Sequence, residues 1–282
     1  MIICSLGHGY VSKYVLREFF LRGAITIGVT SKKKKQEELF DNNHKIYTNQ
    51  EIEKAFNVCT HLLITAAPED TGCPIYSKYL KDIKNSNISC IAYLSSTSVY
   101  GNYKGAWVNE NSKLRGKNNK AKNRKLAEIQ WVNFCKQQKL NYNIFRLGAI
   151  YGPERLNGLN EKKKIIRKSG HYFSRIHVQD ISRLICKILL NGYKNDIWNL
   201  VDSHPSTRED FLIEVAKLKK NQSFKLVDYE IEKKNMTLST INYWENNKKV
   251  SNAKILKNMD YEFIFPNYKT GLKNLLGSKK IN

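Results

Sequence analysis

A glycine-rich turn near the amino terminus, Gly7-His8-Gly9-Tyr10-Val11-Ser12, has the residue types and spacing of a phosphate-binding loop. It follows an apolar run at 2–6 and opens an amphipathic run at 11–22, so the sequence predicts a strand, a tight turn and a helix. In such a unit the first glycine allows the turn, the second lets a diphosphate approach the backbone, and a small residue such as Ser12 allows close packing of helix on strand. The N–H groups at the helix start would bind the phosphate charge. The alternative is a glycine turn without a ligand, and the preceding strand favours a dinucleotide.

The end of the second expected strand, residues 25–30, selects between the nicotinamide dinucleotides. NAD sites usually place Asp or Glu there to accept hydrogen bonds from the ribose hydroxyls. This chain has Val29-Thr30-Ser31-Lys32-Lys33, which offers hydroxyl and ammonium groups and no acid. These groups suit a 2′-phosphate, so the sequence predicts NADP in preference to NAD. The alternative is that Lys32 to Lys35 are a solvated charge run.

Four further motifs occur in order along the chain, and with the glycine turn they cover most of residues 1–205. They are Tyr93-Leu94-Ser95-Ser96-Thr97-Ser98-Val99-Tyr100-Gly101, Arg146-Leu147-Gly148-Ala149-Ile150-Tyr151-Gly152-Pro153, Arg175-Ile176-His177-Val178-Gln179-Asp180 and Trp198-Asn199-Leu200-Val201-Asp202. On these motifs the sequence resembles the extended short-chain dehydrogenase/reductase superfamily, in its sugar-nucleotide epimerase/dehydratase group. Within that group it looks most like the short bacterial atypical members. The resemblance implies an NAD(P)-dependent oxidoreductase or epimerase-like enzyme that acts on a carbonyl or sugar-like small molecule.

The resemblance assigns a catalytic hydroxyl to Ser96, five residues before Gly101. In the family this hydroxyl polarises the substrate oxygen, as carbonyl reduction or alcohol oxidation requires. The alternative is that Ser96 only caps the end of its strand. As in family members, the small residues Thr65-Ala66-Ala67 at another strand end would let the adenosine and its ribose approach the backbone.

The family's second catalytic element, Tyr-x-x-x-Lys at the start of a long helix, is missing. Residues 104–141 contain no tyrosine. When the segment is aligned on Glu128, Lys120 occupies the tyrosine position and Arg124 the lysine position. A shift of one residue places Ala121 at the tyrosine position and Lys125 at the lysine position. Either Arg124 or Lys125 would hold the nicotinamide ribose, and the general acid is left unidentified. The candidate substitutes are Tyr100, Tyr103 and Tyr151.

These interpretations define the predicted site. The predicted catalytic residues are Ser96, Arg124 and Lys125, and the predicted cofactor-binding residues are Gly7, His8, Gly9, Tyr10, Val11, Thr30, Ser31, Lys32, Thr65, Ala66 and Ala67. We further expect His8 to face the cofactor phosphates or solvent, Asp180 to be the N-cap of the helix after it, and His177 to be packed or hydrogen-bonded.

The chain carries a large positive charge, with 48 Lys and Arg against 25 Asp and Glu and a formal net charge of +23. Lysines occur throughout the sequence and asparagine is frequent, which is typical of a lysine- and asparagine-biased proteome. We therefore expect a generally basic solvated surface, with a dedicated polyanion site as the alternative. The missing tyrosine and the charge together favour one alternative function, a non-catalytic NADP-binding regulatory or RNA-binding protein. A small-molecule substrate is favoured over nucleic acid.

The elements that must position these residues alternate along the chain. Six cysteines are scattered without metal-ligand spacing, which predicts reduced structural thiols and no metal. The sequence shows neither a signal peptide nor a membrane span, so we expect a cytoplasmic protein. We also expect a monomer or homodimer. Continuous apolar strands between helices predict an α/β fold, a Rossmann-type doubly wound parallel sheet with a smaller C-terminal substrate lobe. The lobe is expected at 151–176 and 203–282, and the Rossmann domain at 1–150 with 177–202 returning to it. The expected strands are 2–6, 25–30, 61–67, 88–95, 143–147 and 197–201, the helices are 11–22, 49–57, 75–85, 122–138 and 181–191, and a capping box Ser206-x-x-Glu209 opens a helix through 219.

Overall fold

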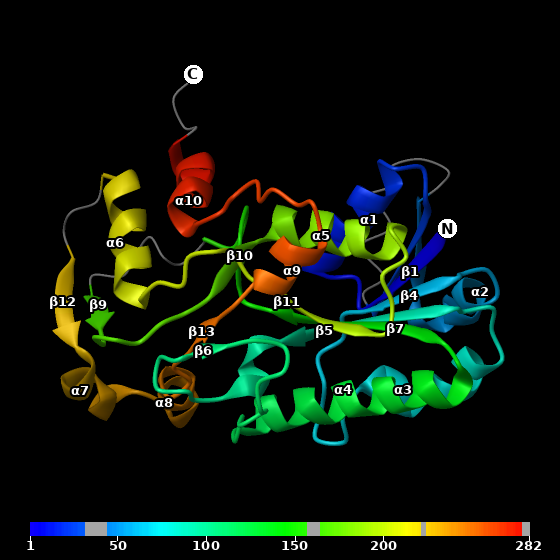
Figure 1. Ribbon diagram of the computed structural model, residues 1–282, viewed down its shortest axis with the longest axis horizontal. Helices are drawn as coiled ribbons and strands as arrows, with labels where there is room; N and C mark the ends of the chain where they lie inside the picture. The colour runs from blue at the N-terminus through cyan, green and yellow to red at the C-terminus, as the bar shows by residue number, and fades with distance from the viewer. Residues whose placement is uncertain (32–43, 157–163, 221–223, 278–282) are drawn as a thin grey trace. The chain divides into compact units, whose positions relative to one another are not determined.

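The computed structural model describes residues 1–31, 44–156, 164–220 and 224–277 (Figure 1). Its contacts divide the chain into two compact units. Unit 1 consists of Met1–Ser96, Asn119–Arg146 and Ile181–Trp198, and unit 2 consists of Thr97–Asn118, Leu147–Asp180 and Asn199–Asn282. The segment 97–118, which the sequence placed in the first domain, belongs to unit 2.

A seven-stranded sheet forms the centre of unit 1, in the order β11-β7-β5-β4-β1-β2-β3. Strand β1 pairs in parallel with both β2 and β4, and these pair in parallel with β3 and β5. This confirms the predicted Rossmann-type parallel sheet. Because β1 lies between β2 and β4, the strand order reverses there, and ligands of such sheets bind beyond the carboxyl ends of the strands at this point. The strands are β1 (Ile2–Leu6), β2 (Ile25–Thr30), β3 (His44–Thr48), β4 (His61–Ile64), β5 (Cys90–Ser96), β7 (Asn141–Leu147) and β11 (Asp196–Leu200).

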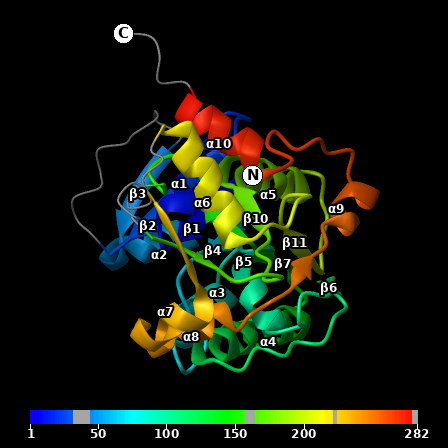
Figure 2. The same cartoon turned by 90° about the vertical axis from the view of Figure 1, so that its left-hand side faces the viewer.

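Helices cover both faces of this sheet, with α1 and α5 on one side and α3 and α4 on the other in both views (Figures 1 and 2). Burial on both faces explains why the strands read as nearly continuous apolar runs. Helix α1 buries Val11, Val15, Leu16 and Phe19, which recur at the spacing of one helix face. The helices are α1 (Tyr10–Phe20), α2 (Ile52–Phe56) after a 3-10 turn (Asn49–Glu51), α3 (Pro74–Lys84), α4 (Asn119–Gln138) and α5 (Val178–Leu190).

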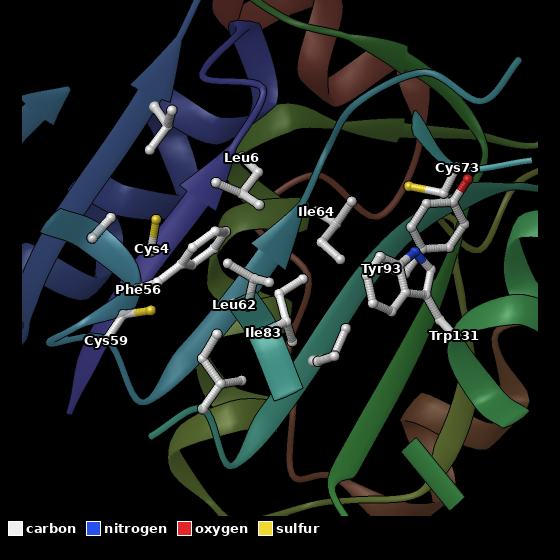
Figure 3. Close-up of a cluster of buried hydrophobic side chains, with 14 of the residues drawn as sticks. Cys4, Leu6, Phe56, Cys59, Leu62, Ile64, Cys73, Ile83, Tyr93 and Trp131 are labelled. Atoms are coloured by element: carbon white, nitrogen blue, oxygen red, sulfur yellow. The ribbon is translucent and has the colours of Figure 1, made fainter. Parts of the chain in front are cut away.

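A core cluster of unit 1 packs between strands β1, β4 and β5 and helices α2, α3 and α4 (Figure 3). Tyr93 and Trp131 are among its largest fully buried side chains. Cysteines also fill this core, and all six in the chain are free thiols in buried positions. Burial raises the pKa of Cys90 to about 11, so this thiol stays protonated and packs as a small apolar side chain.

Strand β3 was not predicted from the sequence. It pairs with β2 at the sheet edge, where His44 lies opposite Thr26 and its imidazole Nδ1 lies 2.6 Å from the Thr26 hydroxyl. The sequence His44–Thr48 follows a lysine-rich segment and holds only two adjacent hydrophobic residues, Ile46 and Tyr47, so it lacks the continuous apolar character of the central strands. The strand expected at 61–67 ends at Ile64, because Thr65 turns to bind the end of β1.

Unit 2 is assembled from short elements. Three two-stranded parallel pairs, β8 with β10, β9 with β12 and β6 with β13, are combined with small helices. No helix in the described part of the chain is both long enough and apolar enough to cross a membrane. The strands are β6 (Trp107–Val108), β8 (Ala149–Tyr151), β9 (Lys164–Arg167), β10 (Arg175–His177), β12 (Lys225–Asp228) and β13 (Lys249–Val250). The helices are α6 (Arg208–Leu218), α7 (Tyr229–Glu232), α8 (Leu238–Trp244), α9 (Ala253–Asn258) and α10 (Tyr268–Gly277), with 3-10 turns at Thr97–Tyr100 and Lys233–Asn235.

Two expected helix caps are wrong in position. The N-cap of α6 is Thr207, whose hydroxyl accepts a hydrogen bond from the Asp210 N–H at 3.0 Å. Asp180 is not an N-cap, because α5 already begins at Val178. Its carboxylate instead accepts hydrogen bonds from the N–H groups of Ile264 and Phe265 at 2.9 and 3.0 Å, which holds the chain before α10.

His177 is packed and hydrogen-bonded, as predicted. Its Nδ1 accepts a hydrogen bond from the Gln179 N–H at 3.2 Å at the start of α5. The ring centroids of Tyr151 and Phe265 lie 5.2 and 4.1 Å away. Burial lowers the pKa of His177 to about 4, so its imidazole is neutral at neutral pH.

Candidate functional site

The glycine turn begins directly after β1 and is fastened to the end of β4. Gly7 has φ +90°, a left-handed conformation, and a Cβ there would lie 3.0 Å from both the Ala66 nitrogen and the Thr65 Oγ1. The Thr65 N–H donates to the Leu6 carbonyl at 3.0 Å, and its hydroxyl donates to the Gly7 carbonyl at 2.5 Å. Only glycine fits this position, and Thr65 fixes the turn at the point where the strand order reverses.

Gly9, unlike Gly7, has a backbone conformation that does not require glycine. Its φ of −124° and ψ of −161° are extended backbone that any residue adopts. Among the residues that the structure describes, a Cβ on Gly9 would meet only the Gly7 carbonyl oxygen, at an ordinary 3.5 Å. The fold therefore has room for a side chain here, and glycine leaves the backbone open in front of α1.

The start of α1 suits an anion. Gly9 is the N-cap of this helix, so no side chain caps it, and the first turn of the fully described helix holds no acidic residue. N–H groups in the first turn of a helix have no partner within the helix, and they carry its partial positive charge. The residues present therefore fit a diphosphate bound against the backbone at this turn.

His8 turns inward, which corrects the expectation that it faces phosphate or solvent. Its side chain is only 7% exposed, and its Nδ1 lies 3.0 Å from the Ser12 hydroxyl, which donates to Ser5 at 2.6 Å. The ring covers Gly28, where a Cβ would lie 2.8 Å from the His8 Nδ1. The Ser12 position was predicted on size alone, and it also supplies the polar link between α1 and β1.

The strand register aligns the remaining predicted segments at one edge of the sheet. Leu6 lies opposite both Val29 and Ile64, and Ile64 lies opposite Tyr93. The segments that follow β1, β2, β4 and β5 therefore leave the sheet at the same edge. Around this edge Thr30 and Val11 are buried, Tyr10, Ala66 and Ser96 are half-buried, Ser31 and Ala67 are exposed, and Lys32 lies outside the described residues.

A buried ion pair that the sequence analysis missed fixes α4 against this edge. The Arg146 Nη2 lies 2.7 Å from the Glu128 Oε2, and the two side chains are 3% and 5% exposed. The Arg146 Nε donates to the Glu128 Oε1 at 3.1 Å, and the Ser95 hydroxyl donates to the same oxygen at 2.5 Å. An arginine inside the apolar strand Asn143-Ile144-Phe145-Arg146-Leu147 was the signal for such a pair, because buried charges need partners.

Arg124, one helical turn before Glu128, reaches the end of β5. Its Nη1 donates to the Leu94 carbonyl at 2.6 Å and to the Tyr93 hydroxyl at 3.3 Å. These are its only hydrogen bonds within the described ranges, so Nε and Nη2 retain N–H donors. Lys125 is exposed, as is Lys120 at the tyrosine position. The structure brings Arg124 to the strand that carries Ser96, and it leaves Lys125 in solvent.

Tyr93 and the three tyrosines considered as substitute acids are buried or hydrogen-bonded to other protein groups. Tyr93 is fully buried, and burial raises the pKa of its hydroxyl well above the ordinary value, which suits a packed group better than a proton donor. Throughout the described segments, no three His, Cys, Asp or Glu side chains are arranged to hold a metal ion. The three candidate substitutes, all in unit 2, donate as follows: Tyr100 to Asn199 Oδ1 at 2.7 Å, Tyr103 to the Lys113 carbonyl at 2.6 Å, and Tyr151 to the Asn267 carbonyl at 3.4 Å.

Comparisons with known proteins agree with this geometry. No family model matches the sequence, and no curated protein matches it significantly. A solved structure of a functionally unknown conserved protein from Silicibacter pomeroyi is similar at 29% identity over 99% of both chains, with a TM-score of 0.91. A human epimerase family protein solved with NADPH is 13% identical over 98% of this chain and 99% of that chain, with a TM-score of 0.77. The UDP-glucose 4-epimerase of Thermus thermophilus, in complex with NAD, is 14% identical over 98% and 97%, with a TM-score of 0.76. The chain therefore has the fold shared by NAD-dependent epimerase/dehydratase and short-chain dehydrogenase/reductase proteins, as its motifs indicated.

Proposed function

We propose that this protein binds NADP at the Gly7–Ser12 turn and acts as an oxidoreductase or epimerase-like enzyme on a carbonyl or sugar-like small molecule. The observation that carries the proposal is Gly9, a glycine that its own backbone conformation and surroundings do not require. A diphosphate against the start of α1 gives that position a reason to lack a side chain. A cytoplasmic location belongs to the same proposal, since all six thiols are free and buried.

The choice of NADP over NAD depends on the residues after β2. Thr30 and Ser31 supply hydroxyls where an NAD site would place a carboxylate. Similar solved structures hold either cofactor, NADPH in the human epimerase family protein and NAD in the epimerase of Thermus thermophilus. Competition between NADPH and NADH for the protein tests the choice directly, and NADPH is expected to bind more tightly.

Two side chains would act on the substrate and cofactor, Ser96 at the end of β5 and Arg124, which reaches this strand end from α4. When bound, the nicotinamide would supply the hydride donor or acceptor. Ser96 would donate its hydroxyl proton in a hydrogen bond to the substrate oxygen as negative charge develops there. Arg124 would donate from its remaining N–H groups to the nicotinamide ribose, in place of the usual lysine.

One observation favours a second function, a non-catalytic NADP-binding regulatory protein. The position of the missing general acid is held by Lys120, which is exposed in the first turn of α4. A lysine there lacks the phenolic hydroxyl that family members use to exchange a proton with the substrate. Under this alternative, cofactor binding is retained and hydride transfer to carbonyl compounds is absent.

Titration calorimetry with Gly9→Ser tests the binding proposal. Serine is a preferred N-cap residue, so this variant should fold with unchanged or slightly higher stability. Its side chain would occupy the space in front of α1 and remove at least one charge-assisted hydrogen bond to phosphate, which lowers NADPH affinity by about 10- to 150-fold. The matched control is Gly277→Ser, another glycine with room for a Cβ, which should bind NADPH normally.

Hydride exchange from NADPH to a panel of carbonyl compounds separates the two functions. For the enzyme, exchange is measurable and Ser96→Ala reduces it strongly while NADPH affinity is retained. NADPH binding without exchange on any compound, in both the unmodified protein and Ser96→Ala, would favour the regulatory protein. Equal NADPH affinity of Gly9→Ser and the unmodified protein would contradict both.

A further inference from the structure

A cavity of about 130 Å³ lies within unit 2 and is lined by residues of β9, α6 and α8. Each element presents residues whose spacing places them on a single face. In β9 the lining residues are two apart, in α6 they are four apart, and in α8 two of them follow the first by three and four residues. They are Lys164 and Ile166 from β9, Arg208 and Leu212 from α6, and Thr240, Tyr243 and Trp244 from α8.

Tyr243 and Trp244 form an aromatic wall of this cavity and pack against other aromatic rings. The ring of Tyr243 stacks on Phe173 at 4.9 Å with an interplanar angle of 20°. Trp244 packs edge-on against Phe173 at 5.9 Å and is tilted against Tyr229 at 5.5 Å. A preformed flat wall loses little conformational entropy when a ligand packs against it.

The polar side of the cavity is cationic. Arg208 donates from Nη1 to the Tyr243 hydroxyl at 3.5 Å, and its guanidinium carbon lies 5.8 Å from the centre of that ring. Among the described residues Arg208 has no ion pair, and no carboxylate lines the cavity. Lys164 is already paired with Glu232 at 3.4 Å. Arg208 is therefore the cation available to a ligand, and the Tyr243 hydroxyl keeps its proton to donate beside it.

We propose that this cavity binds a compact flat carboxylic acid, with the carboxylate on Arg208 and Tyr243 and the flat body between the aromatic wall and Leu212. A guanidinium presents a planar fork of donors that matches a carboxylate. The volume admits one ring, since an apolar cavity of about 150 Å³ is known to hold benzene. The proposal concerns unit 2 alone and is independent of the dinucleotide site.

Titration calorimetry of the full chain with benzoate tests this site. We expect saturable binding at one site per chain, and an affinity for benzyl alcohol, the neutral analogue, that is lower by at least about tenfold. Arg208→Gln should weaken benzoate binding by at least about tenfold. The control Lys217→Gln removes the same charge from an exposed position on the same helix and should change the affinity by less than about twofold.

Three results would overturn the proposal. The first is the absence of saturable benzoate binding to the unmodified protein. The second is equal affinity for benzoate and benzyl alcohol, which would show that Arg208 does not recognise the carboxylate. The third is inorganic phosphate binding as tightly as benzoate, which would indicate an anion site that ignores the flat body. All three use the unmodified chain, so they hold even if Arg208→Gln fails to fold.

Discussion

Replacement of Glu128 by leucine should destabilise unit 1 strongly, because it removes the carboxylate that pairs with the buried Arg146 guanidinium. The variant removes the carboxylate that accepts from Arg146 Nη2 at 2.7 Å and from Arg146 Nε at 3.1 Å. Two hydrogen bonds to charged groups, at about 1.5–3 kcal/mol each, give a loss of about 3–6 kcal/mol. The usual cost of breaking a buried ion pair, about 3–5 kcal/mol, agrees with that range.

The double variant Glu128→Leu with Arg146→Met separates charge from packing. It buries no charge, so most of the loss should be recovered. The Ser95 hydroxyl, which donates to the carboxylate at 2.5 Å, is then left without that acceptor. A buried unsatisfied hydroxyl costs about 1–3 kcal/mol, so the double variant should remain that much less stable than the unmodified protein. Addition of Ser95→Ala should remove this residual difference.

Urea unfolding followed by far-ultraviolet circular dichroism measures these losses as free energies of unfolding. Thermal unfolding gives a second reading, in which each kcal/mol should lower Tm by about 2 °C for a chain of this size. A loss below about 1 kcal/mol for Glu128→Leu, in the range of an exposed pair, would show that the buried pair does not stabilise the fold as expected. So would a double variant as unstable as the single one, since uncompensated charge would then not be the cause.

Three further predictions concern single side chains. Thr65→Val removes the hydroxyl that holds Gly7, so it should weaken NADPH binding while unfolding shows a loss of only about 1 kcal/mol. Arg124→Met should weaken NADPH binding by about tenfold or more, whereas Lys125→Met, on the exposed side of α4, should leave it unchanged in the same titration. Burial raises the pKa of Asp202 to about 8, so the folded state binds its proton more tightly than the unfolded chain, and this contribution to stability is lost as pH rises towards 8. His177 has the opposite effect on stability at lower pH. Its pKa is about 4 in the folded state and about 6.5 in the unfolded chain, so its effect on stability rises with pH up to about 6.5. The decline in stability attributable to Asp202 should therefore be clearest between about pH 6.5 and 8. Asp202→Asn should flatten that decline in unfolding measured across pH, and an unchanged profile would show that the carboxyl is ionised at neutral pH.

The sequence predicted the central elements because their signals are local. An apolar run such as Ile2–Leu6, buried on both faces, cannot be mistaken for a solvated segment, and the glycines that follow it require a turn. Strand β3 was missed because an edge strand needs only one partner, and His44–Thr48 is half polar. Asp180 was misplaced because an acid near a helix start suits an N-cap equally well, and its actual partners lie more than 80 residues later in the chain.

For the site, the sequence located the strand ends but not the contacts between them. Ser96 was predicted from the family resemblance and the Gly7–Ser12 turn from residue types and spacing, but the inward direction of His8 depends on the absence of a side chain at Gly28, a residue on another strand. The choice between Arg124 and Lys125 was open because the alignment had two registers. The buried Glu128 fixes which face of α4 meets β5, and that information exists only in three dimensions.

A crystal structure of the protein grown with saturating NADPH would show whether the glycine turn binds the cofactor. We expect the diphosphate within about 3 Å of backbone nitrogens at the start of α1, close to Gly9, with the nicotinamide end towards Ser96 and Arg124. A dinucleotide bound elsewhere, or a glycine turn that stays empty at saturation, would contradict this expectation.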